Sequence, residues 1–522
     1  MLTTVNWAAD LTAVTDAFAD LTCASDGAGE LRFAELAALA GGVAHRLYAA
    51  GLKPGEPVAT CLRNGLPALW ASAGVRLAGA AETPLNPAFS EAERQHCLDL
   101  AGARRVVTSR SEAPFFAALG VAAIAVEDIA PASLAGLPPV PAAAWGRISF
   151  TSGTTGRPKA IVHTHGARWI ANLLQRASFA HMPGPGSRVL LMTPFTHGAG
   201  LLAAAFLDHG AAIVLLDGVD LAAVERQLQG GTIDHVFAPP TVLAKLAAAF
   251  RGRHFPGIRI VFCGTAPLTP SLYAKARGLF GRVVRITYGK SEVVNPIAIL
   301  PPAACERYYA EEGSGDGFCV GWPGTGVEIA VRGDDGGDVA TDVVGEVHLR
   351  AQHMLAGLID GAGFHPTPDG GWHATGDLGR IDARGRLHLV GRTADVIKSG
   401  GYKIHPEEIE AALAGSAGDA ALVVTTLPSE YWGEVIIAVA EGAPAGWQAR
   451  AAAAAEALAK FKRPRAYLVL DALPRNAQGK VPRGRVREMV LARYRLVDGP
   501  HPELQELQGT SPASATCTSY PP

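Results

Sequence analysis

The sequence contains little of what marks a disulfide-rich or metal-binding protein. Its 522 residues include only seven cysteines, an odd number, and no two of them form a C-x-x-C pair. This pattern argues against a disulfide framework and against a cysteine-based zinc site, and it favours a reducing cytoplasm. The seven positions are Cys23, Cys61, Cys97, Cys263, Cys305, Cys319 and Cys517.

An excess of one charge and long apolar runs are also missing. The formal net charge of -2 gives no electrostatic case for binding nucleic acid or an anionic membrane surface. The longest apolar runs, such as residues 115–126, are too short to span a bilayer. The first ten residues, MLTTVNWAAD, lack the basic start and apolar core of a signal peptide. We therefore expect a cytoplasmic protein with neither nucleic acid nor membrane as a partner.

The composition that is present indicates a globular enzyme of several domains. Hydrophobic residues make up 48% and charged residues 18% of a chain too long for one ordinary core. Up to about residue 310, Ala/Leu-rich helical stretches alternate with short Val/Ile-rich runs, which predicts β-α units on largely parallel sheets. The runs expected to be strands are Arg105–Thr108, Ile213–Leu216, Val236–Ala238, Ile258–Phe262 and Val283–Thr287.

The second part of the sequence changes pattern twice. From about residue 317 to 390, apolar residues alternate with polar ones and glycine is frequent, which predicts an antiparallel β section. After Arg392 we expect a smaller α+β unit, with a helix from Pro406, strands at 421–425 and 435–439, and a helix at 450–460. The predicted class is α/β, with domains at 1–391 and 392–496. The residues 497–522 are rich in Pro, Ser and Thr, which predicts a disordered tail.

One segment outweighs the others, residues 148–166, with the sequence ISFTSGTTGRPKAIVHTHG. A strand is expected to end near Phe150, and hydroxyl and glycine residues follow, with Arg157 and Lys159 adding positive charge. Such a loop can wrap a polyphosphate, because successive unobstructed N–H groups form an anion nest. The alternative is a plain Gly/Ser/Thr turn, and the usual P-loop pattern G-x-x-x-x-G-K-[ST] is absent. The length of the segment favours phosphate binding.

This segment strongly resembles the phosphate-binding signature of the class I adenylate-forming enzymes. These are the acyl- and aryl-CoA synthetases, the adenylation domains of nonribosomal peptide synthetases and the firefly luciferases. The resemblance implies a large N-terminal domain of stacked β-α sheets, a small mobile C-terminal domain, and an active site where they meet. It implies that ATP phosphates are held by Thr151, Ser152, Gly153, Thr154, Thr155, Gly156 and Lys159.

Further motifs follow in the family's order. The segment ITYGKSEV, residues 286–293, resembles the Y-G-x-T-E motif, in which Glu292, with Thr151, helps to hold Mg²⁺ and Tyr288 packs near adenine. Thr287, Gly289 and Ser291 would complete this part of the nucleotide site. Upstream, CGTAP resembles the glycine-rich turn that lies against adenine, formed here by Gly264, Thr265, Ala266 and Pro267. Thr265 stands where glycine is frequent, which suggests a local adjustment.

Three segments nearer the C-terminus resemble family motifs. In GWHATGDLGRID, Asp377 would accept hydrogen bonds from the ribose hydroxyls, and Arg392 would contact ribose or phosphate. In PRNAQGKVPR, Lys480 would bridge the ATP phosphate and the substrate carboxylate, supplying charge where the transition state needs it. In KSGGYKIHPEEIE, Lys398 would enter the site for the second half-reaction. Its neighbours Gly400, Gly401 and Tyr402 would line a channel for CoA. The same residues are also expected to form a glycine hairpin.

One departure concerns the hinge. The family usually has Asp or Lys two positions after the motif arginine, whereas this chain has Ala394 followed by Asp395. Small residues can serve as hinges, so domain rotation is compatible with this sequence. The departure nonetheless weakens the expectation that the second half-reaction follows the ordinary course.

The acid pocket is predicted from PFTHGAG, residues 194–200, in which His197 resembles the gate residue of acyl- and aryl-CoA synthetases. No aspartate stands here to pair with an ammonium group, so an α-amino acid is disfavoured. The lining expected from Phe195, Gly200, Phe237, Gly264 and Gly289 is apolar, which suggests an aryl or a short to medium acyl acid. Lys290 would either pair with a second polar group of the acid or face solvent. We interpret His163 and His165 as ordinary helix-entry residues, because two ligands fall short of a metal site.

The resulting hypothesis is a ligase that uses ATP, Mg²⁺ and coenzyme A, forming acyl-AMP and then acyl-CoA. Three alternatives stay open. The first is a carrier-protein loader that shares the first step. The second is an adenylating enzyme with an amine acceptor, such as one that activates nitrite for diazotisation. The third is a non-catalytic binding protein. The identity of the acid and the oligomeric state, for which a homodimer is one option, are not predicted.

Overall fold

The computed structural model describes residues 2–151, 159–311, 317–368, 370–418, 420–475, 480–507 and 517–519. The side chains of Thr151, Thr196, His197, Asn295, Lys403 and residues 517–519 lie outside this description. The chain divides into two compact units. Unit 1 is Met1–Gly313, Val320–Ile329 and Leu349–His373, and unit 2 is Ser314–Cys319, Ala330–His348 and Ala374–Pro522. The domain boundary at residue 391 stays a prediction.

Unit 1 contains two large sheets, and the first has the strand order β21-β20-β10-β9-β5-β4-β6-β7 in the described residues. The strands from β9 to β7 run parallel, and the others pair antiparallel. Their bounds are β4 Pro57–Cys61, β5 Ala81–Pro84, β6 Arg105–Thr108, β7 Ala122–Ala125, β9 Trp145–Thr151, β10 Lys159–Thr164, β20 Gly357–Asp360 and β21 Gly363–Pro366.

The second sheet of unit 1 has the order β16-β15-β14-β13-β11-β12-β2-β3 and is parallel from β15 to β2. The strands are β2 Thr22–Ser25, β3 Glu30–Arg32, β11 Arg188–Leu191, β12 Ala212–Leu215, β13 His235–Phe237, β14 Ile260–Gly264, β15 Val284–Lys290 and β16 Val293–Leu300. A two-stranded pair, β1 Thr4–Val5 with β8 Val140–Pro141, stands apart. The five Val/Ile-rich runs predicted as strands are all strands, with ends shifted by no more than a few residues.

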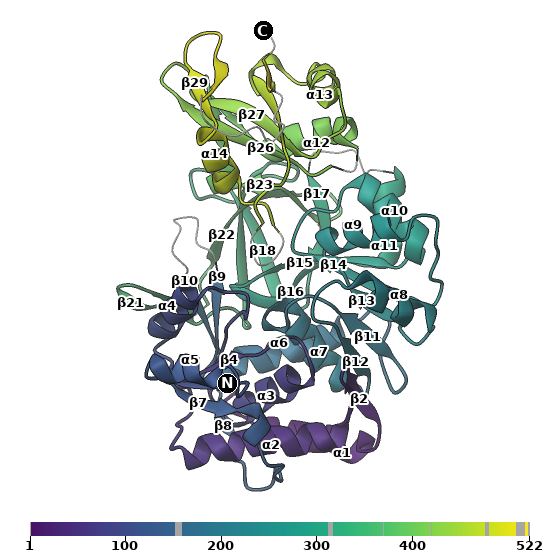
Figure 1. Cartoon of the computed structure of the whole chain (residues 1–522), viewed down its shortest axis with the longest axis vertical. Helices are drawn as coiled ribbons and strands as arrows, with labels where there is room; N and C mark the ends of the chain where they lie inside the picture. Colours follow the sequence, from purple (N-terminus) through teal and green to yellow (C-terminus); the bar gives the residue numbers. More distant parts are fainter. Residues whose placement is uncertain are drawn as a thin grey trace. The chain divides into compact units, whose positions relative to one another are not determined.

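Helices fill the space between these sheets and cover their outer faces (Figure 1). Helix α6 contacts β9 and β10 of the first sheet and β16 of the second. One buried cluster joins Val58 and Val107 of the first sheet to Ile213 and Phe262 of the second, so the two sheets share a core. The helices are α1 Trp7–Phe18, α2 Phe33–Ala49, α3 Leu66–Leu77, α4 Glu91–Ala101, α5 Ala113–Ala118, α6 His165–Ala177, α7 Gly200–Leu207, α8 Leu221–Gln229, α9 Pro240–Ala249, α10 Pro270–Phe280 and α11 Pro302–Glu311.

Unit 2 contains the rest of the predicted β section and the C-terminal α+β unit. In the first part, β18 Val327–Arg332, β19 Gly345–Ala351, β22 His373–Ile381 and β23 Leu387–Arg392 follow one another in the sheet. Of these, only β23 lies wholly in unit 2; β18, β19, β22 and β17 Phe318–Pro323 each have residues in both units. In the second part the order is β25-β24-β27-β28-β31, and β26 pairs with β27. The elements are β24 Ile397–Ser399, β25 Tyr402–Ile404, α12 Pro406–Ala417, β26 Leu422–Ser429, β27 Gly433–Glu441, α13 Trp447–Ala455, β28 Ala466–Leu470, α14 Arg483–Leu491, β29 Tyr494–Val497, β30 Glu503–Glu506 and β31 Cys517–Ser519.

The alternation of side chains along β27 explains how its helices pack. Ile436 and Ala438 belong to the cluster built with Leu413 of α12 and Trp447 of α13. Ile437 belongs to a second cluster, which includes Val486 and Val490 of α14. Successive side chains of a strand point to opposite faces, so α12 and α13 cover one face of this sheet and α14 covers the other.

Two predictions differ from the structure in this region. The helix expected over residues 450–460 runs over Trp447–Ala455, because the fully buried Trp447 anchors its first turn and Pro464 limits helix beyond it. The tail expected from residue 497 includes a strand, since Glu503–Glu506 pairs antiparallel with Tyr494–Val497. Composition alone misses this hairpin, because Leu496 and Leu504 meet only through the pairing.

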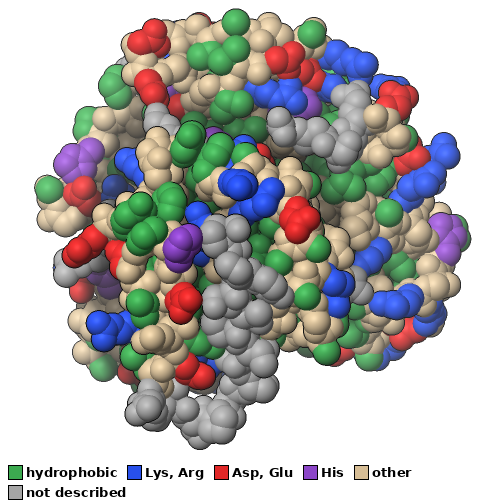
Figure 2. Space-filling view, turned by 90° about the horizontal axis from the view of Figure 1, so that it is seen from above, with side chains coloured by type: hydrophobic (Ala, Val, Ile, Leu, Met, Phe, Trp, Pro, Cys, Tyr) green, Lys and Arg blue, Asp and Glu red, His purple; other side chains and the backbone are tan. Residues whose placement is uncertain are grey.

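The surface agrees with the small net charge. On the face shown in Figure 2, the basic side chains of the described residues are interspersed with acidic ones, without a continuous basic stripe. Of the helices in the described ranges, none combines the length and the hydrophobicity that a membrane crossing requires. The cysteines whose side chains are described, six in number, are all free and buried.

Candidate functional site

The predicted phosphate-binding segment is described only at its two ends. Thr151 ends β9 and Lys159 begins β10, and the two residues pair directly across the antiparallel ladder. The two ends of the segment therefore meet at one place on the sheet, and Lys159 is exposed there. The predicted ligands Ser152, Gly153, Thr154, Thr155 and Gly156 lie outside the described residues.

Two neighbouring parallel strands bring the predicted adenine-binding segments together. Gly264 at the end of β14 pairs with Thr287 of β15. A Cβ atom on Gly264 would lie 2.5 Å from the carbonyl oxygen of Thr287, so only glycine fits. The turn that follows, which contains Ala266 and Pro267, thus starts beside Tyr288 and Gly289. Ligands in α/β sheets bind at the carboxyl ends of parallel strands, which is where these residues lie.

Thr265 adopts a left-handed backbone conformation, with φ of 71°. This conformation is rare for a β-branched residue and costs of order 1–3 kcal/mol. Strain of this kind is often found at ligand sites. The threonine at this position therefore changes the side chain but not the backbone conformation. The backbone keeps a positive φ, which glycine would adopt without strain.

A tight hairpin presents Glu292. Lys290 pairs with Val293, so Ser291 and Glu292 form the two-residue turn between β15 and β16. The carbonyl oxygen of Glu292 accepts a hydrogen bond from the Leu355 amide at 2.8 Å, which fixes the turn. The Glu292 side chain stays partly exposed, and its carboxylate oxygens are the ligand type that Mg²⁺ prefers. Tyr288 is largely buried beside it, with 8% of its surface exposed.

Several residues predicted to line the acid pocket lie at a π-helical turn, Phe195–Ala199, which leads into α7. A Cβ on Gly200 would lie 2.4 Å from the carbonyl oxygen of Phe195, so this wide turn requires glycine. The Phe195 amide donates a hydrogen bond to Oδ1 of Asn64 at 2.7 Å. Phe237 approaches the same turn, 3.6 Å from where a Cβ on Gly198 would lie. Phe195, Gly200 and Phe237 therefore lie close together, while the His197 side chain lies outside the described part. Their role as an acid pocket stays a prediction.

The two histidines after the phosphate segment have structural surroundings. Burial lowers the pKa of His163 and of His165 to about 3, so both rings are neutral near pH 7. The indole Nε1–H of Trp7 donates to Nδ1 of His165 at 3.0 Å. The described residues contain no cluster of three or more His, Cys, Asp or Glu side chains suited to a metal ion. His163 belongs to β10 and His165 begins α6, and both rings are buried within the fold.

In unit 2, the two predicted ribose contacts face each other. Asp377 of β22 pairs with Arg392 of β23, and Nε of Arg392 lies 3.2 Å from Oδ1 of Asp377. The Asp377 backbone amide donates to Oγ1 of Thr375 at 3.0 Å. Asp377 is buried, whereas 49% of the Arg392 side chain is exposed. This carboxylate–guanidinium pair is held in one geometry by the hairpin.

The predicted CoA segment is a two-residue hairpin. Ser399 pairs with Tyr402, and the turn residues Gly400 and Gly401 have φ of 57° and 85°. Two positive φ values are typical of the type I′ turn that joins antiparallel strands, so the glycine hairpin is confirmed. Tyr402 is 52% exposed and stacks on Phe461 at 4.0 Å between ring centroids. Lys398, on β24, is exposed near the same turn.

Sequence reasoning missed Arg483, which follows the predicted catalytic lysine by three residues and pairs with Asp395 at the predicted hinge. Lys480 lies just before α14, and Arg483 begins that helix. The Arg483 guanidinium contacts Glu407 at 2.8 Å, Glu410, and Asp395 at 3.7 Å. Burial by itself would lower the Arg483 pKa, but the three carboxylates outweigh it and raise the pKa. Asp395 closes the short 3₁₀ turn Thr393–Asp395 that contains Ala394, so this ion-pair cluster holds the turn.

Comparison with known proteins agrees with this architecture. The model of the AMP-binding enzyme family matches residues 6–359, so the chain belongs to this family. A feruloyl-CoA synthase of Amycolatopsis sp is 28% identical over 493 residues, covering 89% of this chain and 95% of that protein. A sulfoacetate–CoA ligase of Cupriavidus necator is 29% identical over 486 residues, covering 88% and 92%. A 2-succinylbenzoate–CoA ligase of Bacillus licheniformis is 29% identical over 471 residues, covering 88% and 94%.

Solved structures of adenylate-forming enzymes also resemble this chain over most of its length. The o-succinylbenzoate CoA synthetase of Bacillus subtilis in complex with ATP and magnesium has a TM-score of 0.79 and 26% identity, covering 92% of this chain and 99% of that one. The amide bond synthetase McbA of Marinactinospora thermotolerans has a TM-score of 0.79 and 25% identity, with coverage of 92% and 99%. The predicted fold and the resemblance to adenylate-forming enzymes are confirmed. The family and these relatives show that the chain belongs to the enzyme class of AMP-forming acid–thiol ligases.

Proposed function

We propose that the residues gathered at the carboxyl ends of β14 and β15 bind ATP and activate a carboxylic acid as its adenylate. The observation that carries this proposal is the pairing of Gly264 with Thr287, which places the Gly264–Pro267 turn beside Tyr288 and the Glu292 hairpin. Adenine would lie between this turn and Tyr288. The Asp377 carboxylate, with Arg392 beside it, would accept hydrogen bonds from the ribose hydroxyls.

Charge on the phosphates would be balanced by basic and hydroxyl groups of the sequence motifs. Lys159 at the start of β10 and Lys480 before α14 supply positive charge, and Thr151, Ser152 and Thr154 supply hydroxyls. The oxygens of Glu292 and Thr151 suit Mg²⁺, which when bound would screen the charge of the leaving pyrophosphate. In the chemical step, a carboxylate oxygen of the acid attacks the α-phosphorus, and the bond to pyrophosphate breaks. Lys480 would stabilise the charge that develops on the phosphorus oxygens.

The acid we expect is an aryl or a short to medium acyl acid. Phe195, Gly200 and Phe237 form an apolar wall in unit 1, and His197 belongs to the same turn. Gly264 and Gly289 would leave room for the acid, and Lys290 would pair with a polar substituent. The relatives act, by their names, on feruloyl, sulfoacetate and 2-succinylbenzoate groups, a range that includes aryl and short acids.

For the second step we propose that the thiolate of coenzyme A attacks the acyl carbon and that AMP leaves. Lys398 and the Gly400-Gly401 turn, with Tyr402, would lie along the pantetheine chain once the C-terminal part has turned about residues 393–395. An amine acceptor is the second candidate. It is supported by Ala394 at the hinge position and by the likeness to an amide bond synthetase. A carrier protein is an acceptor that the same first step would also serve.

Lys480→Ala tests the adenylation role. We expect acid-dependent pyrophosphate release to fall by roughly 10²–10³, as on removal of a preorganised charged donor, while ATP binding measured by calorimetry persists. Arg485→Ala is the matched control, because Arg485 lies five residues further on and pairs with Glu488 at the surface. Pyrophosphate release that is equal in the Lys480→Ala and wild-type proteins would remove Lys480 from the mechanism.

A further inference from the structure

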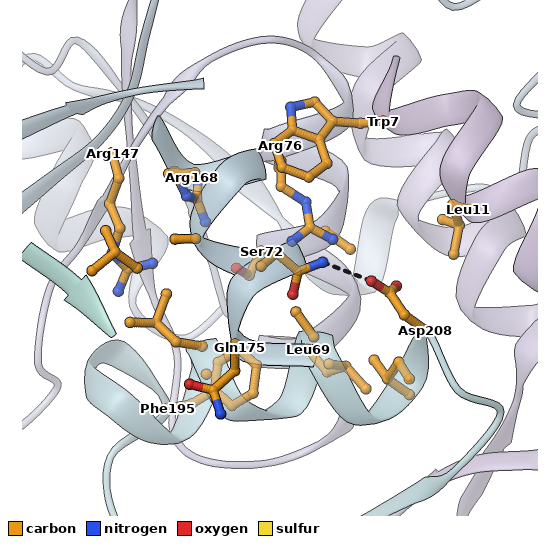
Figure 3. A pocket seen from close by; sticks show the side chains of 18 of the residues that line it. Trp7, Leu11, Leu69, Ser72, Arg76, Arg147, Arg168, Gln175, Phe195 and Asp208 are labelled. Atoms are coloured by element: carbon orange, nitrogen blue, oxygen red, sulfur yellow. Dashed lines mark hydrogen bonds between the residues drawn. The ribbon is translucent and has the colours of Figure 1, made fainter. Parts of the chain in front are cut away.

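Unit 1 contains a cavity of about 70 Å³ between helices α1, α3, α6 and α7 (Figure 3). By the same measure a water molecule needs about 10–15 Å³, so the cavity has room for several waters or for a small functional group. Leucine, alanine and aromatic side chains form much of its wall. Three arginines, Arg76, Arg147 and Arg168, also line it, which is an unusual composition for the interior of a protein.

Two of these arginines share one carboxylate. Glu82 of β5 lies beside Arg147 of β9 in the parallel ladder, and Nη1 of Arg147 is 2.8 Å from Oε2 of Glu82. Nη2 of Arg168, from α6, lies 3.1 Å from the same oxygen. Burial by itself would raise the Glu82 pKa, but Arg147 and Arg168 outweigh it and lower the pKa. One negative charge therefore faces two positive ones, and all three side chains are less than 10% exposed.

The third arginine has no carboxylate of its own. Arg76 of α3 lies over the Trp7 ring at 4.8 Å and makes no hydrogen bond or ion pair through its side chain with any residue that the structure describes. Its Nε is buried and unsatisfied. The nearby Asp208 accepts a hydrogen bond from Asn172 at 2.6 Å and faces Arg176 at 3.5 Å, so it already has a cationic partner.

The charges around the cavity do not balance. Four guanidinium groups, those of Arg76, Arg147, Arg168 and Arg176, surround two carboxylates, Glu82 and Asp208. Even when the exposed Asp10 of α1 is counted, the described side chains around the cavity carry one more positive charge than negative charges. His163 contributes none, since its lowered pKa keeps it neutral. Arg76 is partly buried, and leaving a cation uncompensated away from water is costly, so an anion that enters this cavity would be stabilised.

One end of the cavity belongs to the predicted acid pocket. Phe195 and Gly200, which form the wall of that pocket, also line the cavity, as does Val294, two residues after Glu292. We propose that the cavity is the far end of the acid pocket and holds a second anionic group, a carboxylate or sulfonate, of the acid that is activated. This inference rests on the proposed function and narrows its substrate class to acids with two anionic ends.

In this arrangement the two ends of the acid have different surroundings. The reacting carboxylate lies at the Glu292 end, and the aliphatic or aryl body passes Phe195 and Gly200. The second anion accepts hydrogen bonds from the free N–H groups of Arg76, with Arg147 and Arg168 adding charge. The apolar lining expected from the sequence describes the passage, whereas the cavity beyond it is cationic. Guanidinium groups suit planar carboxylates because they offer paired donors.

The test compares matched acids that differ only in the far group. The pairs are succinate with butyrate, adipate with hexanoate, and phthalate with 2-methylbenzoate, each assayed for pyrophosphate release with ATP and Mg²⁺. The wild-type protein should favour at least one diacid over its partner in kcat/KM. Arg76→Met should reduce that preference by roughly 10- to 100-fold, as expected for loss of a charged hydrogen bond. Arg285→Met is the control, because Arg285 is buried and also lies over an aromatic ring, that of Phe262, but does not line this cavity.

A direct binding measurement separates the possible results. Calorimetry with the three diacids and with inorganic sulfate is run on the wild-type and Arg76→Met proteins. If the wild-type protein binds a diacid and Arg76→Met abolishes this binding, the anion site in the cavity is supported. If, in addition, no acid causes release of pyrophosphate, the proposed function is refuted while the anion site stands. A preference for the monoacids, or an unchanged preference in Arg76→Met, overturns the inference. Binding of sulfate without any diacid preference overturns it too, because the cavity would then hold a free inorganic ion.

Discussion

Replacing Arg483 with methionine removes the cation that three carboxylates share in unit 2. Glu407 and Glu410 lie on one face of α12, and Asp395 closes the 3₁₀ turn before β24. Arg483 also donates a hydrogen bond to the carbonyl oxygen of Val424 at 2.7 Å, which connects α14 to strand β26. Methionine keeps the apolar stem but leaves the two glutamates facing each other without a counter-charge.

The magnitude follows from the burial of this cluster. Removing one partner of a buried ion pair costs about 3–5 kcal/mol. The side chains of Arg483, Glu407 and Glu410 are 19%, 17% and 22% exposed, so we expect the lower end of that range. For a unit of this size each kcal/mol lowers Tm by about 2–4 °C, so the transition of unit 2 should fall by roughly 6–12 °C.

Differential scanning calorimetry measures this shift. Arg485→Met is the matched control, because Arg485 lies one half-turn further along α14 and its pair with Glu488 is exposed, worth about 0–1 kcal/mol. We expect the control to unfold within a few degrees of the wild type. If Arg483→Met and Arg485→Met shift Tm by the same small amount, the cluster does not stabilise unit 2 and the reasoning is refuted.

Three further predictions concern unit 1. Thr265→Gly should raise the free energy of unfolding by about 1 kcal/mol, because glycine adopts the positive φ without strain, and a lower Tm in this variant would contradict the strain. Gly264→Ala should lower Tm and acid-dependent pyrophosphate release together, since its Cβ would lie 2.5 Å from the Thr287 carbonyl; unchanged values of both would show that β14 and β15 can separate. His163 and His165 have pKa values lowered from 6.5 to about 3, so the native state binds fewer protons than the unfolded chain between these values. Stability should therefore fall as the pH drops from 6.5 towards 3, by up to about 2.7 kcal/mol per pH unit, and substituting both with Gln should flatten this fall in Tm measured between pH 4 and 7.5.

Local patterns in the sequence predict most of the elements that carry the site. The glycine pair before Tyr402 predicts a hairpin because few other residues adopt two successive positive φ values. The strand that ends in Gly264 is visible as an apolar run, and the requirement for glycine follows from the adjacent β15. Such features depend on a few neighbouring residues, so a sequence shows them directly.

The arginine-lined cavity could not be predicted in this way. Glu82 and Arg147 are 65 positions apart, and their contact exists only because β5 and β9 are neighbours in the first sheet. In the sequence, Arg76 is indistinguishable from a surface residue near the end of a helix. In the structure, Trp7 of α1 packs against it. The same holds for Asn64, which fixes Phe195 from 131 positions away. Long-range packing decides these contacts, and no local pattern encodes it.

The most direct test of the proposed function is product analysis with ATP, Mg²⁺ and a panel of carboxylic acids, with and without coenzyme A. Pyrophosphate release and mass spectrometry of the products are followed together. Adenylation followed by thioester formation predicts acid-dependent pyrophosphate release that coenzyme A accelerates, with the matching acyl-CoA among the products. Pyrophosphate release that ignores coenzyme A and yields no acyl-CoA, from every acid of the panel, would contradict the second step and leave an amine or a carrier protein as the acceptor.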